Sequence, residues 1–401
     1  MVMFDEKVLE KYKNLNRGIE ERMINLHPIQ SGGRAGDYPG VVQAVLRFVD
    51  GYSVCDFCMK GRLDLIDSPP LCDFHKDIAA FLDMDEARLF PGCRQAQYAA
   101  FHALVKAEDT IIIDSLAHYS TYLSAERVGA NIVEVPHSGQ PDFELLLDAY
   151  AEKIEEVKKE TGKRPALAFL THVDYNYGNV FDAKKVGAIL HDYGIPFVLN
   201  GAYTIGRMPI SGKDLGADVL TASLHKSFAS PAPSGLLLAK DGYADVVFKS
   251  SSIRGSWSGR NFGNKEVETL GCTLPGCVAI GVMAAFPYVV KRVKRWDEEV
   301  KKARYFIEQL ERIKGVKQLG QHPHNHDLIH FESESFFEIS KNHPRKGFFL
   351  YEDLRERGVT GVQPGLSNAF KVSTYGKTWD QIKLAAESFL DIAQKYNIPT
   401  Y

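Results

Sequence analysis

Thr221-Ala222-Ser223-Leu224-His225-Lys226-Ser227 is the stretch around which the rest of the chain is organised. It follows a strand-like run at 217–220 and precedes a turn of small residues and an apolar strand at 235–239. A lysine that directly follows a buried strand is suited to form a Schiff base, because the strand fixes its backbone. The neighbouring hydroxyl and imidazole can bind a phosphate beside it. The same residues also fit a solvated lysine at an ordinary strand exit, so the motifs upstream must decide.

The composition bounds the class of protein. The 401 residues are 45% hydrophobic and 25% charged, which is typical of a soluble globular protein of two or three domains. The formal net charge of −3 excludes a generally basic nucleic-acid coat, so any contact with nucleic acid must be a local patch. No apolar run reaches membrane-spanning length, and the first residues lack the order of a signal peptide. We therefore expect a cytoplasmic protein without a membrane partner.

From about residue 87 onward, strand-like and helix-like segments alternate. The predicted strands, of which the last three are expected to be buried, lie at 87–90, 110–113, 131–135, 166–170 and 196–199. The predicted helices between them run to residue 104, over 141–159 and over 182–193. Such alternation predicts an α/β fold with a mainly parallel sheet flanked by helices, whose ligands bind beyond the strand ends.

The ends of these strands carry polar groups. Gly92 opens a helix after the first strand, where backbone N–H groups and the helix dipole can hold an anion, and Arg94 can add a charged contact. The later strands are followed by His118, Asp174, Asn200 and Lys226. One polar strand end is commonplace, but this series, with an anion-binding turn first and a lysine last, predicts a phosphorylated cofactor held as an imine.

The six cysteines are too few for a disulfide scaffold in a chain of this length, so their spacing is read for redox or metal-binding roles. Cys55 and Cys58 form a Cys-x-x-Cys, which favours a reactive thiol, a local disulfide or half a metal site. With Cys72 and His75 they have the spacing of a zinc site. Residues 72–78 also read as the start of a helix, which would make Cys72 and His75 packing or surface residues. From these residues alone, redox chemistry and zinc are equally supported.

The rest of the chain divides into three parts. We expect an N-terminal helical arm over 1–40, a large cofactor-binding domain over 41–290 and a smaller C-terminal α/β domain over 291–401. Within them, residues 1–25 are predicted to form an amphipathic helix, and one long helix is predicted from about Val278 past Trp296. A polar loop holds His322, His324 and His326, and we expect it to be a surface turn.

The motifs, taken in this order, resemble fold-type I pyridoxal-phosphate enzymes of the aminotransferase class V kind. Within that class, the resemblance narrows to the O-phosphoseryl-tRNA:cysteinyl-tRNA synthase family and runs nearly end to end. The stretches that carry it are residues 50–58, 117–119, 171–174, 202–209, 270–273 and 370–376.

This resemblance implies an activity and a set of site residues. The expected reaction replaces the phosphate of phosphoseryl-tRNA(Cys) with sulfur, with Lys226 holding pyridoxal phosphate and removing the Cα proton, and with His118 stacked on the pyridine ring. The cofactor-binding residues that it implies are Cys93, Arg94, His118, Asp174, Asn200, Ser223, Leu224, His225 and Lys226. Cys55, Cys58 and Cys272 match three functional cysteines, which would carry sulfur as a persulfide or hold an iron–sulfur cluster.

Two residue choices agree with this reaction. Asn200 stands where most enzymes of this cofactor class place an acid at the pyridine nitrogen, so the electron sink is weaker. Phosphate is a good leaving group and needs less stabilisation of negative charge on the substrate. The strand around Lys371 has no arginine to clamp an α-carboxylate, and an aminoacyl ester to tRNA has no free carboxylate.

The resemblance also implies partners. They are tRNA(Cys) carrying phosphoserine, a second copy of the chain at whose boundary the active site lies, phosphoseryl-tRNA synthetase and an accessory protein. The basic loop from Ser250 to Arg260 is placed by sequence to reach the partner's site. Two alternatives stay open: a cysteine desulfurase or lyase of the same fold, and a zinc-binding RNA-associated protein built on the Cys-x-x-Cys, Cys72 and His75.

Overall fold

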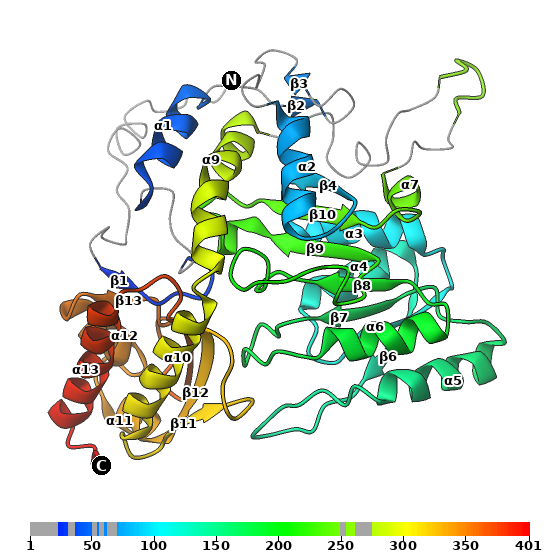
Figure 1. Ribbon diagram of the computed structural model, residues 1–401. Helices are drawn as coiled ribbons and strands as arrows, with labels where there is room; N and C mark the ends of the chain where they lie inside the picture. The colour runs from blue at the N-terminus through cyan, green and yellow to red at the C-terminus, as the bar shows by residue number, and fades with distance from the viewer. Residues whose placement is uncertain are drawn as a thin grey trace, which may run out of the picture.

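The computed structural model has a large domain, with a hydrophobic core on each face of its sheet, and a small domain with a core of its own (Figure 1). The structure describes residues 23–30, 37–49, 70–248, 254–260 and 275–401, together with the backbone of 54–55 and 60–61. The predicted helix over 1–25 is wrong at its end, because Ile24–Asn25 form strand β1. The other residues of that helix that precede Met23 lie outside the described residues.

The large domain is built on a seven-stranded sheet in the order β4-β10-β9-β8-β7-β5-β6. Its strands are β4 (Glu86–Phe90), β5 (Thr110–Asp114), β6 (Asn131–Val135), β7 (Ala168–Thr171), β8 (Phe197–Asn200), β9 (Val219–Ser223) and β10 (Gly235–Ala239). Only β10 runs antiparallel to its neighbours; the five strands from β9 to β6 are parallel. The predicted mainly parallel α/β fold is confirmed.

Helices cover both faces of this sheet (Figure 1) because neighbouring residues of its strands point to opposite sides. In β7, Ala168 and Leu170 enter one core while Phe169 enters the other. The first core also holds α1 (Pro39–Arg47), α2 (Leu71–Phe81), α5 (Ala149–Thr161), α6 (Ala183–Asp192) and α9 (Gly276–Val293). The second holds α3 (Cys93–Leu104), α4 (Tyr119–Val128) and α7 (Ala244–Val247).

Two details of the expected pattern differ near the sheet edge. Strand β6 is not a buried strand: it pairs only with β5, and of its residues only Val135 is buried. Helix α5 begins at Ala149 rather than near residue 141, since His137 and Leu145 form an antiparallel bridge instead. The exposure of β6 comes from its position at the sheet edge, which the local sequence does not report.

The small domain packs helices against a three-stranded antiparallel sheet in the order β11-β12-β14. Its elements are α10 (Trp296–Glu311), β11 (Val316–Leu319), β12 (Leu328–Ser333), α11 (Glu334–Asn342), α12 (Phe348–Glu356), β13 (Val359–Thr360), β14 (Ala369–Ser373) and α13 (Trp379–Lys395). Strand β1 pairs in parallel with β13, and Ile24 and Leu26 join the small-domain core. The segment after Met23 is therefore part of the small domain's packing.

The predicted long helix through Trp296 is two helices, since α9 ends at Val293 and α10 begins at Trp296. The first turn of α10 carries Asp297, Glu298 and Glu299, which favour a helix start through the helix dipole. Within the described part of the chain, α9 is the one helix long and apolar enough to cross a membrane by length and composition. Half of it is buried inside the protein, and the core helix of a soluble protein passes the same test.

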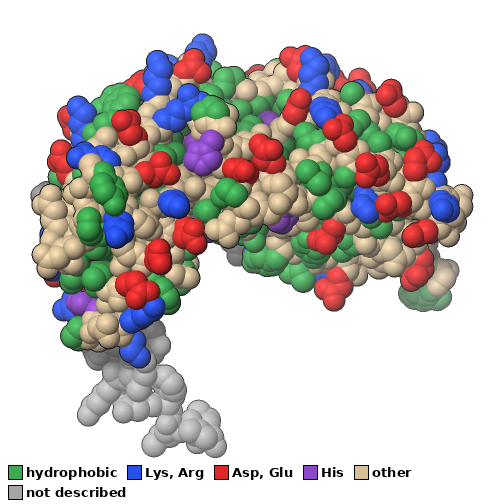
Figure 2. Space-filling view, turned by 90° about the horizontal axis from the view of Figure 1, so that it is seen from below, with side chains coloured by type: hydrophobic (Ala, Val, Ile, Leu, Met, Phe, Trp, Pro, Cys, Tyr) green, Lys and Arg blue, Asp and Glu red, His purple; other side chains and the backbone are tan. Residues whose placement is uncertain are grey.

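The surface seen from below in Figure 2 carries basic and acidic side chains interspersed. The outline of this face is hollowed between its two lobes. No large surface of one sign is present on this side of the described residues, which fits the near-neutral charge of the whole chain. A nucleic acid would find only local basic groups here.

Candidate active site

A pocket of about 1070 Å³ lies where the carboxyl ends of the large-domain strands meet the small domain. Its lining comes from the turn before α3, the ends of β7 to β9, residues near β1 and the strands β12 and β14. The charged side chains in the described lining are Arg94, Lys226 and Lys371, and none is a carboxylate. Such a pocket suits ligands with negative charge.

Lys226 lines this pocket. It ends a 3-10 turn, η3 (Leu224–Lys226), that follows directly on β9, so the sheet fixes its backbone. Burial lowers the pKa of its ammonium to about 7, and the positive charges of Arg207, Lys371 and Arg94 act in the same direction. Its Nζ lies 3.7 Å from the centroid of the Tyr203 ring. A large fraction of the amine is therefore neutral, and nucleophilic, at neutral pH.

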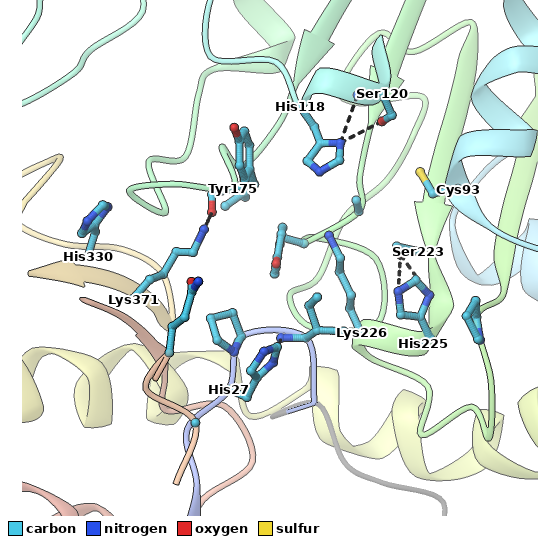
Figure 3. A pocket seen from close by; sticks show the side chains of 18 of the residues that line it. His27, Cys93, His118, Ser120, Tyr175, Ser223, His225, Lys226, His330 and Lys371 are labelled. Atoms are coloured by element: carbon cyan, nitrogen blue, oxygen red, sulfur yellow. Dashed lines mark hydrogen bonds between the residues drawn. The ribbon is translucent and has the colours of Figure 1, made fainter. Parts of the chain in front are cut away.

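An anion site is formed at the turn between β4 and α3. Gly92, the N-cap residue of α3, has no side chain to cap the helix, so the first N–H groups of α3 are available to a ligand. Ser223 and His225 stand beside it, with Ser223 Oγ 3.2 Å from His225 Nδ1 (Figure 3). Strand β10 comes so close that a Cβ on Gly235 would lie 2.3 Å from the carbonyl carbon of Gly92. These groups can hold a phosphate.

His118 and Asn200 face the same pocket in fixed orientations. His118 caps α4, its Nδ1 accepting the N–H of Ser120, and burial lowers the pKa of the ring to about 4. Asn200 Oδ1 accepts the N–H of Ala202 at 2.9 Å. This leaves the side-chain N–H groups of Asn200 without a hydrogen bond to any described residue, so they can donate to an aromatic nitrogen.

Comparison with known proteins agrees with this geometry. The family model for O-phosphoseryl-tRNA(Sec) selenium transferase, SepSecS, matches residues 99–392. The chain is 48% identical to O-phospho-L-seryl-tRNA:Cys-tRNA synthase 2 of Archaeoglobus fulgidus over 377 residues, 94% of this chain and 95% of that protein. It is 47% identical to O-phospho-L-seryl-tRNA:Cys-tRNA synthase of Methanopyrus kandleri over 390 residues, 97% of this chain and 99% of that protein. The chain belongs to the O-phospho-L-seryl-tRNA:Cys-tRNA synthase family.

Solved structures agree with the synthase family and its fold. A structure of the SepCysS–SepCysE N-terminal domain complex matches with a TM-score of 0.85 and 43% identity, covering 96% of this chain and 99% of that one. An apo cysteine desulfurase from Thermococcus onnurineus NA1 matches with a TM-score of 0.73 and 19% identity over 93% of this chain and 95% of that one, which shows the fold alone. The fold is that of fold-type I pyridoxal-phosphate enzymes.

Two of the expected cofactor-binding residues of this synthase fold lie outside the pocket lining. Asp174 is fully buried, and its carboxylate accepts the N–H groups of Asn176, Tyr177 and Asn179 at 2.7–2.8 Å. It shapes the loop that carries Tyr175 to the pocket. Leu224 packs in the large-domain core, and its N–H donates to the carbonyl of Ser234. Their contact with the cofactor stays a prediction.

The three cysteines expected to handle sulfur in the synthase family lie largely outside the described residues. Only the backbone of Cys55 is described, in β2 (Val54–Cys55), which pairs with β3 (Lys60–Gly61). Cys58 and Cys272 are not described. Cys93 does line the pocket, 3.9 Å from Asn200 Oδ1, and burial raises the pKa of its thiol. Cys93 therefore lies in the pocket as a protonated thiol at the start of α3.

One of the four residues with zinc-site spacing, His75, already makes a hydrogen bond to the backbone. Cys72 and His75 lie in α2, as the helical reading of that segment predicts. His75 is buried, and its Nε2 accepts the N–H of Leu89 at 3.1 Å. That nitrogen is occupied by a backbone group and is not available to a metal.

Sequence reasoning missed several residues at the domain boundary of this synthase fold. The histidine loop is not a surface turn, because His324 and His326 are buried and His326 Nε2 bonds the Tyr203 carbonyl at 3.0 Å. Lys371 and His330, from neighbouring strands of the small domain, reach into the pocket. The alternation of buried Phe370 and Val372 around Lys371 was the available signal that this lysine faces away from the core.

Proposed function

We propose that this protein converts O-phosphoseryl-tRNA(Cys) into cysteinyl-tRNA(Cys). The observation that carries the proposal is the arrangement in one pocket of a neutralised lysine, an uncapped helix N-terminus and a described lining without carboxylates. That arrangement suits a substrate and a cofactor that both carry phosphate. The relatives from Archaeoglobus fulgidus and Methanopyrus kandleri are named for this reaction, and this chain matches them over almost their whole length.

The residues present fit pyridoxal phosphate. The uncapped turn before α3, with Ser223 and His225, would hold its phosphate; His118 would cover the ring; and Asn200 would donate to the ring nitrogen. Lys226 would attach its aldehyde carbon. When bound, the group supplies an electron sink for the charge left on Cα after a proton is removed. An asparagine donor leaves the ring nitrogen unprotonated, so this sink is moderate.

Lys226 would move the Cα proton. With a pKa of about 7, its amine can accept this proton at neutral pH and return it to Cα later. As the proton leaves, the Cβ–O bond breaks and its electron pair departs with phosphate. The cations of the pocket stabilise that departing charge.

Sulfur would arrive on Cys55, Cys58 or Cys272, as a persulfide or through an iron–sulfur cluster. In the persulfide route, the terminal sulfur bonds to Cβ and Lys226 returns the proton to Cα. A neighbouring thiolate then attacks the protein-side sulfur of the S–S link, so that the electron pair leaves on the substrate sulfur and a protein disulfide forms. The close pair Cys55 and Cys58 is suited to that last step. Hydrosulfide can then attack the protein disulfide, which re-forms the persulfide on one cysteine and releases the other as a thiolate.

The partners follow from this reaction and from the relatives. A solved relative is a complex with the SepCysE N-terminal domain, and we propose an equivalent accessory protein for this chain. We also propose a cytoplasmic homodimer that receives its charged tRNA from phosphoseryl-tRNA synthetase. The segment Arg254–Arg260, with its two arginines and an exposed Trp257, is the described part of the loop expected to reach the partner copy.

The direct test is a conversion assay. The purified protein, loaded with pyridoxal phosphate, is given phosphoseryl-tRNA(Cys) and sulfide, and the aminoacyl group is identified by mass spectrometry. Cysteinyl-tRNA is the expected product. A protein that instead releases sulfide and alanine from free cysteine, and leaves phosphoseryl-tRNA unchanged, is a desulfurase and contradicts the proposal.

A further inference from the structure

Lys371 brings a positive charge to the small-domain side of the pocket. It lies in β14 of the small domain, opposite His330 of β12 in the sheet register. Among the described residues its ammonium makes no ion pair, and it donates one hydrogen bond, to the carbonyl oxygen of Tyr175 at 2.7 Å. An ammonium has three N–H donors, so it retains donors for a ligand.

The position of Lys371 separates it from the cofactor-phosphate site. In Figure 3 it enters from the side of Tyr175 and His330, while Ser223 and His225 lie on the other side of Lys226. Arg94 belongs to the first turn of α3, beside the expected cofactor phosphate. Two phosphate dianions repel each other strongly at short range, so a second phosphate needs its own cations away from the first.

Two imidazoles complete the surroundings of Lys371. His27 Nδ1 accepts the N–H of Ile29 at 3.2 Å, which leaves the proton of a neutral ring on Nε2 as a donor. His330 hydrogen-bonds the backbone of Asn176, and burial lowers the pKa of its ring to about 4, so it stands beside Lys371 as a neutral ring. Both rings line the pocket with Lys371. Lys371 and His27 together offer donors and a charge, with no carboxylate in the described lining.

We propose that Lys371, flanked by His27 and His330, binds the phosphate of the phosphoseryl group and selects phosphoserine over serine. This rests on the proposed function and names the recognition element of its substrate. The phosphate would be held at the small-domain wall while Lys226 faces Cα. When the Cβ–O bond breaks, Lys371 keeps the released phosphate away from the cofactor phosphate. Lys371 is thus assigned as a specificity-determining residue.

The test compares binding of two charged tRNAs. The borohydride-reduced holoenzyme, which does not turn over, is titrated with phosphoseryl-tRNA(Cys) and with seryl-tRNA(Cys). Lys371→Met should lower affinity for the first about 10- to 100-fold, as expected for a lost charge-assisted hydrogen bond, and leave the second unchanged. Lys371→Arg should retain part of the preference. Lys383→Met, an exposed lysine of α13, is the matched control and should bind as wild type.

The outcomes separate this proposal from the function it rests on. Equal loss of affinity for both tRNAs in Lys371→Met would mean that Lys371 only ties the Tyr175 loop to the small domain, which overturns the subsite. An unchanged preference for phosphoseryl-tRNA would also overturn it, while leaving the synthase function intact. A wild-type protein that prefers neither tRNA would contradict the proposed function itself.

Discussion

At the scale of single residues, the site depends on how burial and like charges tune Lys226. Burial is the main reason that its pKa falls to about 7, and the charges of Arg207, Lys371 and Arg94 add to the effect. An exposed lysine with a pKa near 10.4 would be almost fully protonated at neutral pH and unreactive. The same pocket keeps His118 neutral, since the pKa of its ring is lowered to about 4.

The pKa of Lys226 predicts a pH dependence for cofactor capture. Only the neutral amine attacks an aldehyde, so the rate at which the apo protein takes up pyridoxal phosphate should rise with pH, with a midpoint near 7. Below pH 6 the rate should fall about tenfold per unit. Rapid-mixing absorbance measurements between pH 5.5 and 9 check this. A rate that still climbs tenfold per unit between pH 8 and 9 would show an ordinary lysine.

Residue patterns predicted some of these side chains and not others. Lys226, His118 and Asn200 follow buried strands, and parallel strands bring such ends together, so their meeting could be predicted. Asp174 stands at a similar position but turns its carboxylate to the N–H groups of its own loop. A polar residue at a strand end can face either way, and the sequence holds no signal that separates the two.

At the scale of elements, the contact between α2 and β4 explains the position of His75, which the sequence also allowed as a zinc ligand with Cys72. Strand β4 is the edge of the large sheet, so the N–H of Leu89 that points away from β10 has no strand partner. His75 of α2 accepts it, and the imidazole is only 4% exposed. Burial, and then the charge of Arg88, lowers the pKa of this ring to about 3, so it remains a neutral acceptor.

We therefore expect His75→Ala to lower the free energy of unfolding by about 2–3 kcal/mol, from the unsatisfied N–H and the cavity. Cys72→Ser, one turn away and half-buried, should change it by under about 0.5 kcal/mol. Chemical denaturation of both variants at pH 7.5 measures this. A zinc site would instead make both changes equally damaging and sensitive to a chelator.

The same histidine has a pH signature. Its pKa is lower in the folded than in the unfolded chain, where it is about 6.5, so acid favours the unfolded state. The stabilisation by His75 is complete above pH 6.5 and is lost as the pH falls below it, by about 2 kcal/mol at pH 5. The difference in free energy of unfolding between wild type and His75→Ala should therefore shrink as the pH falls from about 6.5 to about 5.

At the scale of the whole molecule, the pocket exists only where the two domains meet. Arg207 of the large domain forms a buried ion pair with Asp327 of the small domain and also donates to the carbonyl oxygens of Pro28 and Lys226, at 2.9 and 3.0 Å. One guanidinium thus joins the backbone of Lys226, the segment after β1 and the small domain. Such buried pairs are costly to break because one charge is left without its partner.

These long-range contacts are what the sequence could not predict. Arg207 and Asp327 are 120 residues apart, and His326 meets the carbonyl of Tyr203 across 123 residues. Local polarity predicts exposure for a run with three histidines, whereas the domain interface buries two of them. The strand–helix alternation of the large domain is local and periodic, so its sheet and most of its helices could be predicted.

The most direct test of the central assignment is to locate the cofactor on the chain. The holoenzyme is reduced with borohydride and digested, and the peptides are examined by mass spectrometry. We expect the reduced pyridoxyl group on Lys226 alone, and we expect Lys226→Ala to lose both the label and the formation of cysteinyl-tRNA. A label on another lysine, or a Lys226→Ala variant that still produces cysteinyl-tRNA, would contradict the account.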